Sequence, residues 1–212
     1  MTPMNEPRVF SLGRLAAAGL LVALAACDVI PPPQDDPTRY YILSGGAAPA
    51  ASPAPGAARL GLRTVRLEPY LSRREMVVRT GANEVAFKDY RRWAEPLESA
   101  IARELRADLL SSPSVAQVHS EPFLSGDARD YDVSVEVTRF EGVAASGRFS
   151  ASLTAVVEIS TAGDSPHVVS HKVFVAPAAA WDGSNYEQLA AALSRDVAAL
   201  AQDIVAELPP RG

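Results

Sequence analysis

Residues 131–137 read YDVSVEV and residues 148–159 read RFSASLTAVVEI. In both segments apolar side chains alternate with polar ones, which predicts β-strands with one buried face and one solvent-exposed face. A third segment, HVVSHKVFV at 167–175, has a similar strand-forming composition. Because short connections join the three segments, we expect them to form an antiparallel meander.

Other strand candidates are shorter and rich in β-forming residues: 39–43, 60–68, 75–79, 84–88 and 114–119. We expect a break near Thr64 in the second of them. The third and fourth flank the sequence TGAN at 80–83, which predicts a hairpin because Gly and Asn readily adopt positive φ.

The first helix is predicted over residues 92–111. An apolar residue recurs at every fourth position from Trp93 to Leu109, which places them on one face. Pro96 is tolerated only near the first turn of a helix, so we expect the helix to begin close to Arg92. Trp93 is then interpreted as a core residue at the start of this apolar face.

The second helix is predicted over residues 184–208, where Ser184 and Glu187 match a capping box. Its polar face carries mainly acidic residues, which argues against a helix that lies on a membrane surface. The two amphipathic helices and the sheet each have one apolar face. All of these faces are buried if both helices cover the apolar face of the sheet. The sequence therefore predicts an α+β fold, a two-layer sandwich with a mainly antiparallel sheet and two amphipathic helices on one face.

An export signal is predicted at the N-terminus. Residues 15–26 read LAAAGLLVALAA, an apolar run that is shorter than the ~20 residues needed to span a bilayer and that suits a signal peptide. It ends in Leu24, Ala25, Ala26 and Cys27, which look like a bacterial lipobox at all four positions. In such a signal the cysteine receives a diacylglycerol and an N-acyl chain, and we expect these on Cys27 and no other cofactor. The alternative is that Cys27 is a buried residue of an anchor helix.

The expected organisation follows from these segments. Residues 1–26 form the signal peptide, residues 27–38 a lipidated Pro-rich tether, and residues 39–208 a single α+β domain. Within the domain, residues 44–58 consist of small residues and proline, and we expect this loop to be mobile. Residues 209–212 form a short tail.

Composition excludes several function classes. The chain of 212 residues has 20 Lys and Arg against 25 Asp and Glu, and the net charge of -5 argues against nucleic-acid binding. A single cysteine allows no intrachain disulfide. The sequence contains neither a G-x-x-x-x-G-K-[ST] phosphate-binding loop nor a G-x-S-x-G nucleophile motif.

Two groups of side chains contain residue types that can bind metals. His167 and His171 are four residues apart on a predicted strand, but a metal would need a third ligand that the sequence does not supply. Glu121 and the aspartates at 127, 130 and 132 form an acidic loop without the spacing of an EF-hand. We interpret the histidines as surface residues and the acidic loop as solvated, and we predict no metal site.

Three aromatic and apolar residues are candidates for a partner interface. Trp181 lies in a loop among small residues just before the second helix, where an exposed aromatic side chain could anchor a partner. Tyr70 and Leu71 precede a charged run and could form an exposed rim. The alternative for each is packing within the domain.

The order of these features resembles the PqiC-like ABC-type transport auxiliary lipoprotein family. The resemblance is carried by the lipobox and by YYIL at 40–43, PYL at 69–71, RTGAN at 79–83 and RWAEPL at 92–97. It implies a non-enzymatic accessory lipoprotein that works beside MCE-domain proteins and associated inner-membrane transporter components in lipid transport. Such a protein docks the periplasmic assembly at a membrane and supports envelope integrity.

Several alternatives stay open. The resemblance implies the outer membrane, whereas Asp28 directly after the anchor favours retention in the inner membrane. A homo-oligomer would match ring-like MCE partners. The alternative function is a lipoprotein cofactor of cell-wall synthesis or envelope assembly, and a periplasmic hydrolase is a more remote one.

Overall fold

The computed structural model describes residues 35–45 and 52–209. Residues 38–212 form one compact unit, which contains every helix and strand of the described ranges. The lipobox, Cys27 and most of the expected tether lie outside the described residues, as do residues 46–51 of the loop and 210–212 of the tail. No helix in the described ranges is long and apolar enough to span a membrane.

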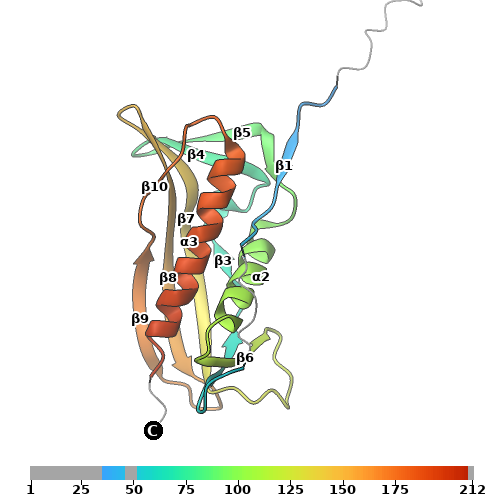
Figure 1. Cartoon of the computed structure of the whole chain (residues 1–212), viewed down its shortest axis with the longest axis vertical. Helices are drawn as coiled ribbons and strands as arrows, with labels where there is room; N and C mark the ends of the chain where they lie inside the picture. Colours follow the sequence, from blue (N-terminus) through green and yellow to red (C-terminus); the bar gives the residue numbers. More distant parts are fainter. Residues whose placement is uncertain (1–34, 46–51, 210–212) are drawn as a thin grey trace, which may run out of the picture. The chain divides into compact units, whose positions relative to one another are not determined.

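The described part contains a ten-stranded sheet, two α-helices and a 3-10 helix, η2 (Figure 1). In chain order the elements are β1 (Arg39–Tyr41), β2 (Ala58–Leu62), β3 (Arg66–Leu67), η2 (Pro69–Leu71), β4 (Glu75–Gly81), β5 (Glu84–Trp93), α2 (Leu97–Leu110), β6 (Val115–Ser120), β7 (Tyr131–Ala145), β8 (Arg148–Thr161), β9 (Val168–Val175), β10 (Ala179–Ala180) and α3 (Tyr186–Ala206).

The long strand β7 organises the sheet. Along one edge it pairs in parallel with β2, β3 and β4, and along the other it pairs antiparallel with β8. Strand β9 adds antiparallel to β8, which confirms the predicted meander of β7, β8 and β9. The break expected near Thr64 separates β2 from β3.

Parallel pairing is more extensive than the sequence suggested. Strand β1 runs parallel to β5, and β2 runs parallel to both β6 and β7. The α+β class is confirmed, but the sheet is mixed rather than mainly antiparallel. The reason is that β2, β3 and β4 return to the same edge of β7 through connections that local sequence patterns do not reveal.

Helices α2 and α3 cover one face of the sheet, as predicted (Figure 1). Their apolar stripes are fully buried: Ile101, Leu105 and Leu109 on α2, and Leu189, Leu193, Val197, Leu200 and Ile204 on α3. Each apolar side chain transferred from water in this way contributes about 1.5–3 kcal/mol before the entropy of ordering is subtracted.

The predicted start of the first helix was wrong. Strand β5 continues to Trp93, whose backbone N–H donates to the carbonyl of Arg74 at 2.7 Å, and α2 begins only at Leu97 after Pro96. Trp93 is nevertheless a core residue, 3% exposed, with its ring 5.8 Å from that of Phe140. The four-residue spacing from Trp93 to Leu97 therefore spans a strand end and a helix start.

The predicted cap of the second helix was displaced by one residue. Asn185, not Ser184, is the N-cap, and its Oδ1 accepts hydrogen bonds from the backbone N–H groups of Glu187 and Gln188, both at 3.1 Å. Ser184 instead donates through its backbone N–H to Asp182 at 2.7 Å. Asn is as good an N-cap as Ser, so the local sequence could not rank the two.

The hairpin around residues 80–83 is confirmed by the pairing of β4 with β5. Neither Gly81 nor Asn83 has a positive φ, so the reason given for that turn was wrong.

The loop at 44–58 is hydrogen-bonded to the rest of the domain at both of its described ends. The backbone N–H of Ser44 donates to Ser194 Oγ at 3.1 Å, and that of Ala54 donates to the carbonyl of Pro113 at 2.8 Å.

Candidate functional site

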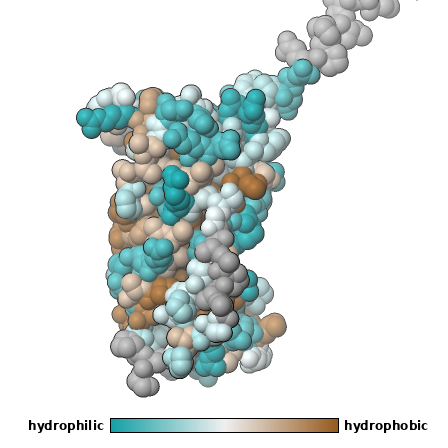
Figure 2. Space-filling model, in the orientation of Figure 1, coloured by the Kyte–Doolittle hydropathy of each residue, from teal (hydrophilic) through white to brown (hydrophobic). Residues whose placement is uncertain are grey.

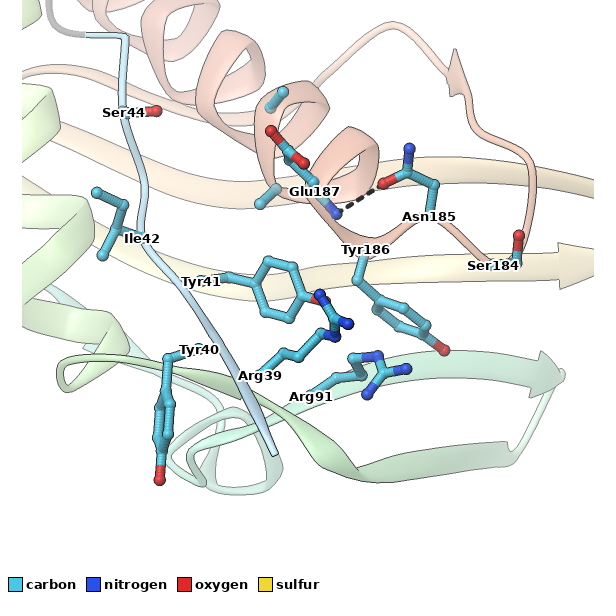
Figure 3. Close-up of a pocket in the computed structure, with 12 residues that line it drawn as sticks. Arg39, Tyr40, Tyr41, Ile42, Ser44, Arg91, Ser184, Asn185, Tyr186 and Glu187 are labelled. Carbon is cyan, nitrogen blue, oxygen red and sulfur yellow. Dashed lines mark hydrogen bonds between the residues drawn. The ribbon is translucent and has the colours of Figure 1, made fainter. Parts of the chain in front are cut away.

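A pocket of about 780 Å³ opens where β1, the end of β5 and the start of α3 meet (Figure 3). This volume falls within the range of small-molecule sites. Its lining residues are Arg39, Tyr40, Tyr41, Ile42, Ser44, Arg91, Ser184, Asn185, Tyr186, Glu187, Ala190 and Ala191.

Arg39 and Arg91 lie side by side on one wall of the pocket. In the parallel pairing of β1 with β5, Arg39 lies opposite Arg91, so the two side chains share one face of the sheet. Nη1 of Arg91 donates to the carbonyl of Tyr90 at 2.9 Å, and its guanidinium lies 5.7 Å from the ring of Tyr186. Among the described residues no salt bridge joins either arginine to a carboxylate.

The first turn of α3 forms the opposite wall. The side chain of Asn185 occupies the N–H groups of Glu187 and Gln188, and Asp182 accepts from the backbone N–H groups of Ser184 and Asn185. These backbone hydrogen bonds lower the pKa of Asp182. The carboxylate of Asp182 therefore offsets the partial positive charge of the helix end, and Asn185 and Asp182 together occupy several of its N–H donors.

The rings of Tyr41 and Tyr186 line the pocket, and the buried Trp181 packs against Tyr186. The ring of Tyr41 lies 6.3 Å from that of Tyr186, which lies 5.3 Å from that of Trp181. Burial raises the pKa of Tyr186, although the nearby charge of Arg91 acts in the opposite direction. Tyr186 is thus a neutral hydroxyl at physiological pH. Glu187 is the carboxylate among the lining residues, and Figure 3 shows its side chain directed away from the two arginines.

The chemistry available here is recognition of an anion. Apart from the carboxylate of Glu187, the lining combines guanidinium groups, neutral hydroxyls and an amide, which bind oxyanions without reacting with them. Sequence reasoning missed Arg39 and Arg91. Residues 39–43 were predicted as a strand, but the alignment of that strand against 91–93 appears only in the folded chain.

The structure does not expose two of the predicted interface residues. Leu71 is 1% exposed and Trp181 is 5% exposed. Trp181 packs against Phe149 and Tyr186, with ring centroids 5.8 Å and 5.3 Å away, because the loop before α3 folds back onto the sheet. The exposed rim and exposed anchor expected at these positions are therefore absent.

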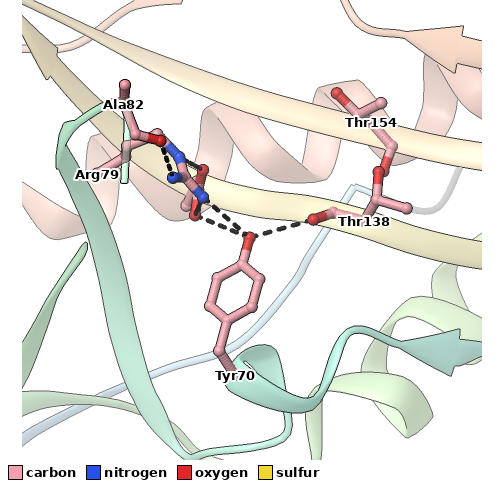
Figure 4. A network of polar contacts seen from close by, with 6 residues as sticks. Tyr70, Arg79, Ala82, Thr138 and Thr154 are labelled. Atoms are coloured by element: carbon pink, nitrogen blue, oxygen red, sulfur yellow. Dashed lines mark hydrogen bonds and ion pairs between the residues drawn. The ribbon is translucent and has the colours of Figure 1, made fainter. Parts of the chain in front are cut away.

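Tyr70, the third predicted interface residue, belongs to a polar network inside the fold (Figure 4). Its hydroxyl lies 3.1 Å from Oε2 of Glu141 and 3.1 Å from the carbonyl of Thr138, and Nη2 of Arg79 donates to it at 3.4 Å. Burial, followed by the charge of Glu141, raises the pKa of Tyr70 to about 12. This residue is a structural hydrogen-bonding group at neutral pH.

The acidic loop is ion-paired rather than solvated. Asp130 pairs with Arg59 at 2.8 Å, and the buried Asp132 pairs with Arg63 and Arg129, both at 3.0 Å. Among residues 35–45 and 52–209 no group of His, Cys, Asp or Glu side chains is arranged to hold a metal ion. Arginines of the same domain thus pair with Asp130 and Asp132, whereas Oδ1 of Asp127 lies 3.2 Å from Nδ1 of His119.

Comparison with known proteins identifies the family. The family model for the ABC-type transport auxiliary lipoprotein component matches residues 41–205. No curated protein matches the chain. The fold is similar to a crystal structure of a DUF330 protein from Xanthomonas campestris, with a TM-score of 0.66, 18% identity and coverage of 79% of this chain and 92% of that one.

A crystal structure of an uncharacterised protein gives a TM-score of 0.60 and 21% identity, and covers 81% of this chain and 99% of that one. At these identities the two structures show the shared fold alone. The family match spans nearly all of the folded unit and begins at Tyr41, the last residue of β1, so Arg39 and Tyr40 lie just outside it. The chain therefore belongs to the ABC-type transport auxiliary lipoprotein family, whose description is that of a membrane-associated transport component and not of an enzyme.

Proposed function

We propose that this chain is a periplasm-facing accessory lipoprotein of an MCE-type lipid transport system, and that it docks the periplasmic transport assembly at a membrane and supports envelope integrity. The observation that carries the proposal is the family match over residues 41–205, which covers nearly all of the folded unit. The proposed action is non-catalytic, because an auxiliary component binds and positions its partners.

The proposed mechanism is tethering. Acyl chains on Cys27 would fix the chain to the membrane, and residues 28–38 would supply the reach. The folded unit begins directly afterwards, because Arg39 already lies in β1 and pairs with β5. A pull on the tether therefore acts on a strand built into the sheet.

The test is in-cell crosslinking with a C-terminal affinity tag, followed by mass spectrometry of the captured proteins. Photoreactive residues placed at Tyr90 on β5 and at Val173 on β9 sample two exposed parts of the sheet, since these side chains are 54% and 60% exposed. We expect an MCE-domain protein to be captured from at least one of the two positions, which would also locate the docking face.

Capture of a peptidoglycan synthase with no MCE-domain protein would overturn the proposal in favour of a role in cell-wall synthesis. The matched control is the same photoreactive residue at Leu193, which is 1% exposed and should capture no partner. Density-gradient separation of the two membranes then tests whether the anchor lies in the outer membrane, which the family resemblance implies, or in the inner membrane, which Asp28 favours.

A further inference from the structure

The two arginines of the pocket are a pair of like charges on adjacent strands, whereas other charged pairs across the sheet carry opposite charges. Arg66 lies opposite Glu136 across β3 and β7, and the pair is bridged at 3.1 Å. Glu75 likewise lies opposite Arg92 across β4 and β5, and a salt bridge of 3.3 Å joins the two side chains. Arg39, by contrast, lies opposite Arg91.

Like charges directly opposite each other destabilise a sheet. Neighbouring strands lie about 4.8 Å apart, so two guanidiniums on one face can reach the same small group. An anion between Arg39 and Arg91 would convert this repulsion into two attractive contacts. The start of α3 adds little to this attraction, because Asp182 and Asn185 already occupy its backbone N–H groups, so the two arginines supply it.

The geometry favours a tetrahedral oxyanion over a carboxylate. One guanidinium can occupy both oxygens of a carboxylate in a bidentate contact, whereas a phosphate group offers further oxygens to a second arginine. The neutral hydroxyls of Ser44 and Tyr186 line the same pocket and supply additional donors, whereas the hydroxyl of Ser184 already donates to Asp182.

The pocket has more room than a bare phosphate needs. Its volume of about 780 Å³ leaves space for an organic substituent. The rings of Tyr41 and Tyr186 line the same pocket with their centroids 6.3 Å apart, so an apolar surface borders the charged one. A ligand with a phosphate and an apolar part would contact both.

We propose that this pocket binds a phosphate ester, with the phosphate held between Arg39 and Arg91. The ester comes either from a phospholipid headgroup or from a free phosphorylated compound. A lipidated Cys27 would bring the first source close, because residues 28–38 span at most about 40 Å when fully extended. The inference goes beyond the proposed function, since phosphate binding requires no transport partner.

The test is calorimetric titration of the full chain in non-ionic detergent. The ligands are inorganic phosphate, glycerol phosphate, dihexanoyl phosphatidylglycerol below its micelle concentration, and dihexanoylglycerol, which lacks the phosphate. We expect both phosphate esters to bind and dihexanoylglycerol not to bind. Phosphatidylglycerol that binds more tightly than glycerol phosphate would identify the headgroup as the source, and equal affinities would identify the free ester.

The variants Arg39→Gln and Arg91→Gln should each weaken phosphate-ester binding at least about tenfold. The matched control is Arg148→Gln, which removes an exposed arginine from the start of β8 and should leave binding unchanged. Each pocket variant should also melt at the same temperature as the parent protein or higher in low salt, because it removes the repulsion between like charges.

Three results would overturn the inference. The first is no binding of either phosphate ester by the parent protein. The second is binding that survives in the doubly substituted Arg39→Gln, Arg91→Gln protein. The third is equal binding of dihexanoylglycerol and phosphatidylglycerol. None of these results depends on the MCE-domain partner, so failure here and failure of the proposed function can be told apart.

Discussion

Arg79 on β4 donates through its Nε to Oε1 of Glu141 on β7 at 2.5 Å, and the side chain of Glu141 is completely buried. The two residues are 62 positions apart. Tyr70, from η2, completes the site by contacting the other carboxylate oxygen. The PYL and RTGAN segments that resemble family motifs therefore meet around one buried carboxylate, which gives both an architectural role.

We predict that Glu141→Gln lowers the free energy of unfolding by about 3 kcal/mol, because it leaves the charge of Arg79 without its buried partner. The measurement is urea denaturation followed by circular dichroism. Glu136→Gln is the matched control: it breaks an ion pair on the same strand, but that pair is largely exposed and should contribute less than about 1 kcal/mol. Equal losses in the two variants would contradict this account.

Gly61 is required by close packing of the arginine–aspartate cluster. A Cβ atom at this position would collide with Oδ1 of Asp132, and it would lie 2.8 Å from Cδ of Arg129 and 2.9 Å from Cζ of Phe123. Gly61→Ala should therefore cost about 1–3 kcal/mol in urea denaturation. Gly126→Ala, at a glycine with open space around its Cβ position, should cost far less, and a similar cost would refute the steric argument.

Trp181 should behave as a packing residue. Trp181→Ala removes a buried ring from contact with Phe149 and Tyr186 and should cost about 3 kcal/mol or more. Trp181→Phe keeps an aromatic ring and should cost much less, since the indole N–H has no hydrogen-bond partner among the described residues. Iodide should quench tryptophan emission weakly in the folded protein, and strong quenching lost in Trp181→Phe would show an exposed anchor instead.

Asp196 makes stability depend on pH. It is 5% exposed on α3, and burial, opposed only in part by the charge of Arg195, raises its pKa from 3.8 to about 6. The folded state thus favours the protonated form. Its contribution to stability is complete below pH 4 and is lost as the pH rises through about 6.

The parent protein should therefore lose about 2–3 kcal/mol of stability relative to Asp196→Asn between pH 4 and pH 7.5. Urea midpoints of both proteins across this range check the prediction, and taking the difference removes the contribution of the other titrating groups. A difference that stays constant with pH would show that Asp196 titrates normally.

Cys27→Ala should abolish incorporation of labelled palmitate. When the variant is also given a cleavable, non-lipoprotein signal peptide in place of residues 1–26, it should appear in the soluble periplasmic fraction. Its urea midpoint should match that of the parent, because the folded unit begins after the tether. A variant that stays in the membrane pellet after a high-salt wash would refute the tethering mechanism.

Much of the secondary structure can be predicted from the amino-acid sequence alone. Side-chain alternation in 131–137 and 148–159 is a local property of an extended backbone, so it identified β7 and β8 and their antiparallel pairing. The apolar spacing in 97–109 and 189–204 identified α2 and α3 and the faces that they bury. The lipobox prediction at Cys27 likewise depends only on consecutive residues, although it lies outside the described part of the chain.

The periodicity of apolar residues does not locate the boundary between a strand and the helix that follows it. The apolar spacing continues without a break from Trp93 to Leu97, yet the first ends β5 and the second begins α2. The carbonyl of Arg74 and the parallel strand β1 hold Trp93 in the sheet, and both partners are remote in sequence. A pattern of spacing carries no information about such partners.

The candidate site depends on pairing between distant segments. Arg39 meets Arg91 only because β1 joins the edge of β5 in parallel, and Glu141 becomes a buried carboxylate only because β4 and η2 close over β7. Short-range sequence determines which segments become strands and helices, since those preferences act within a few residues. Strand partners, and with them the charges that face each other, are selected by packing of the whole chain.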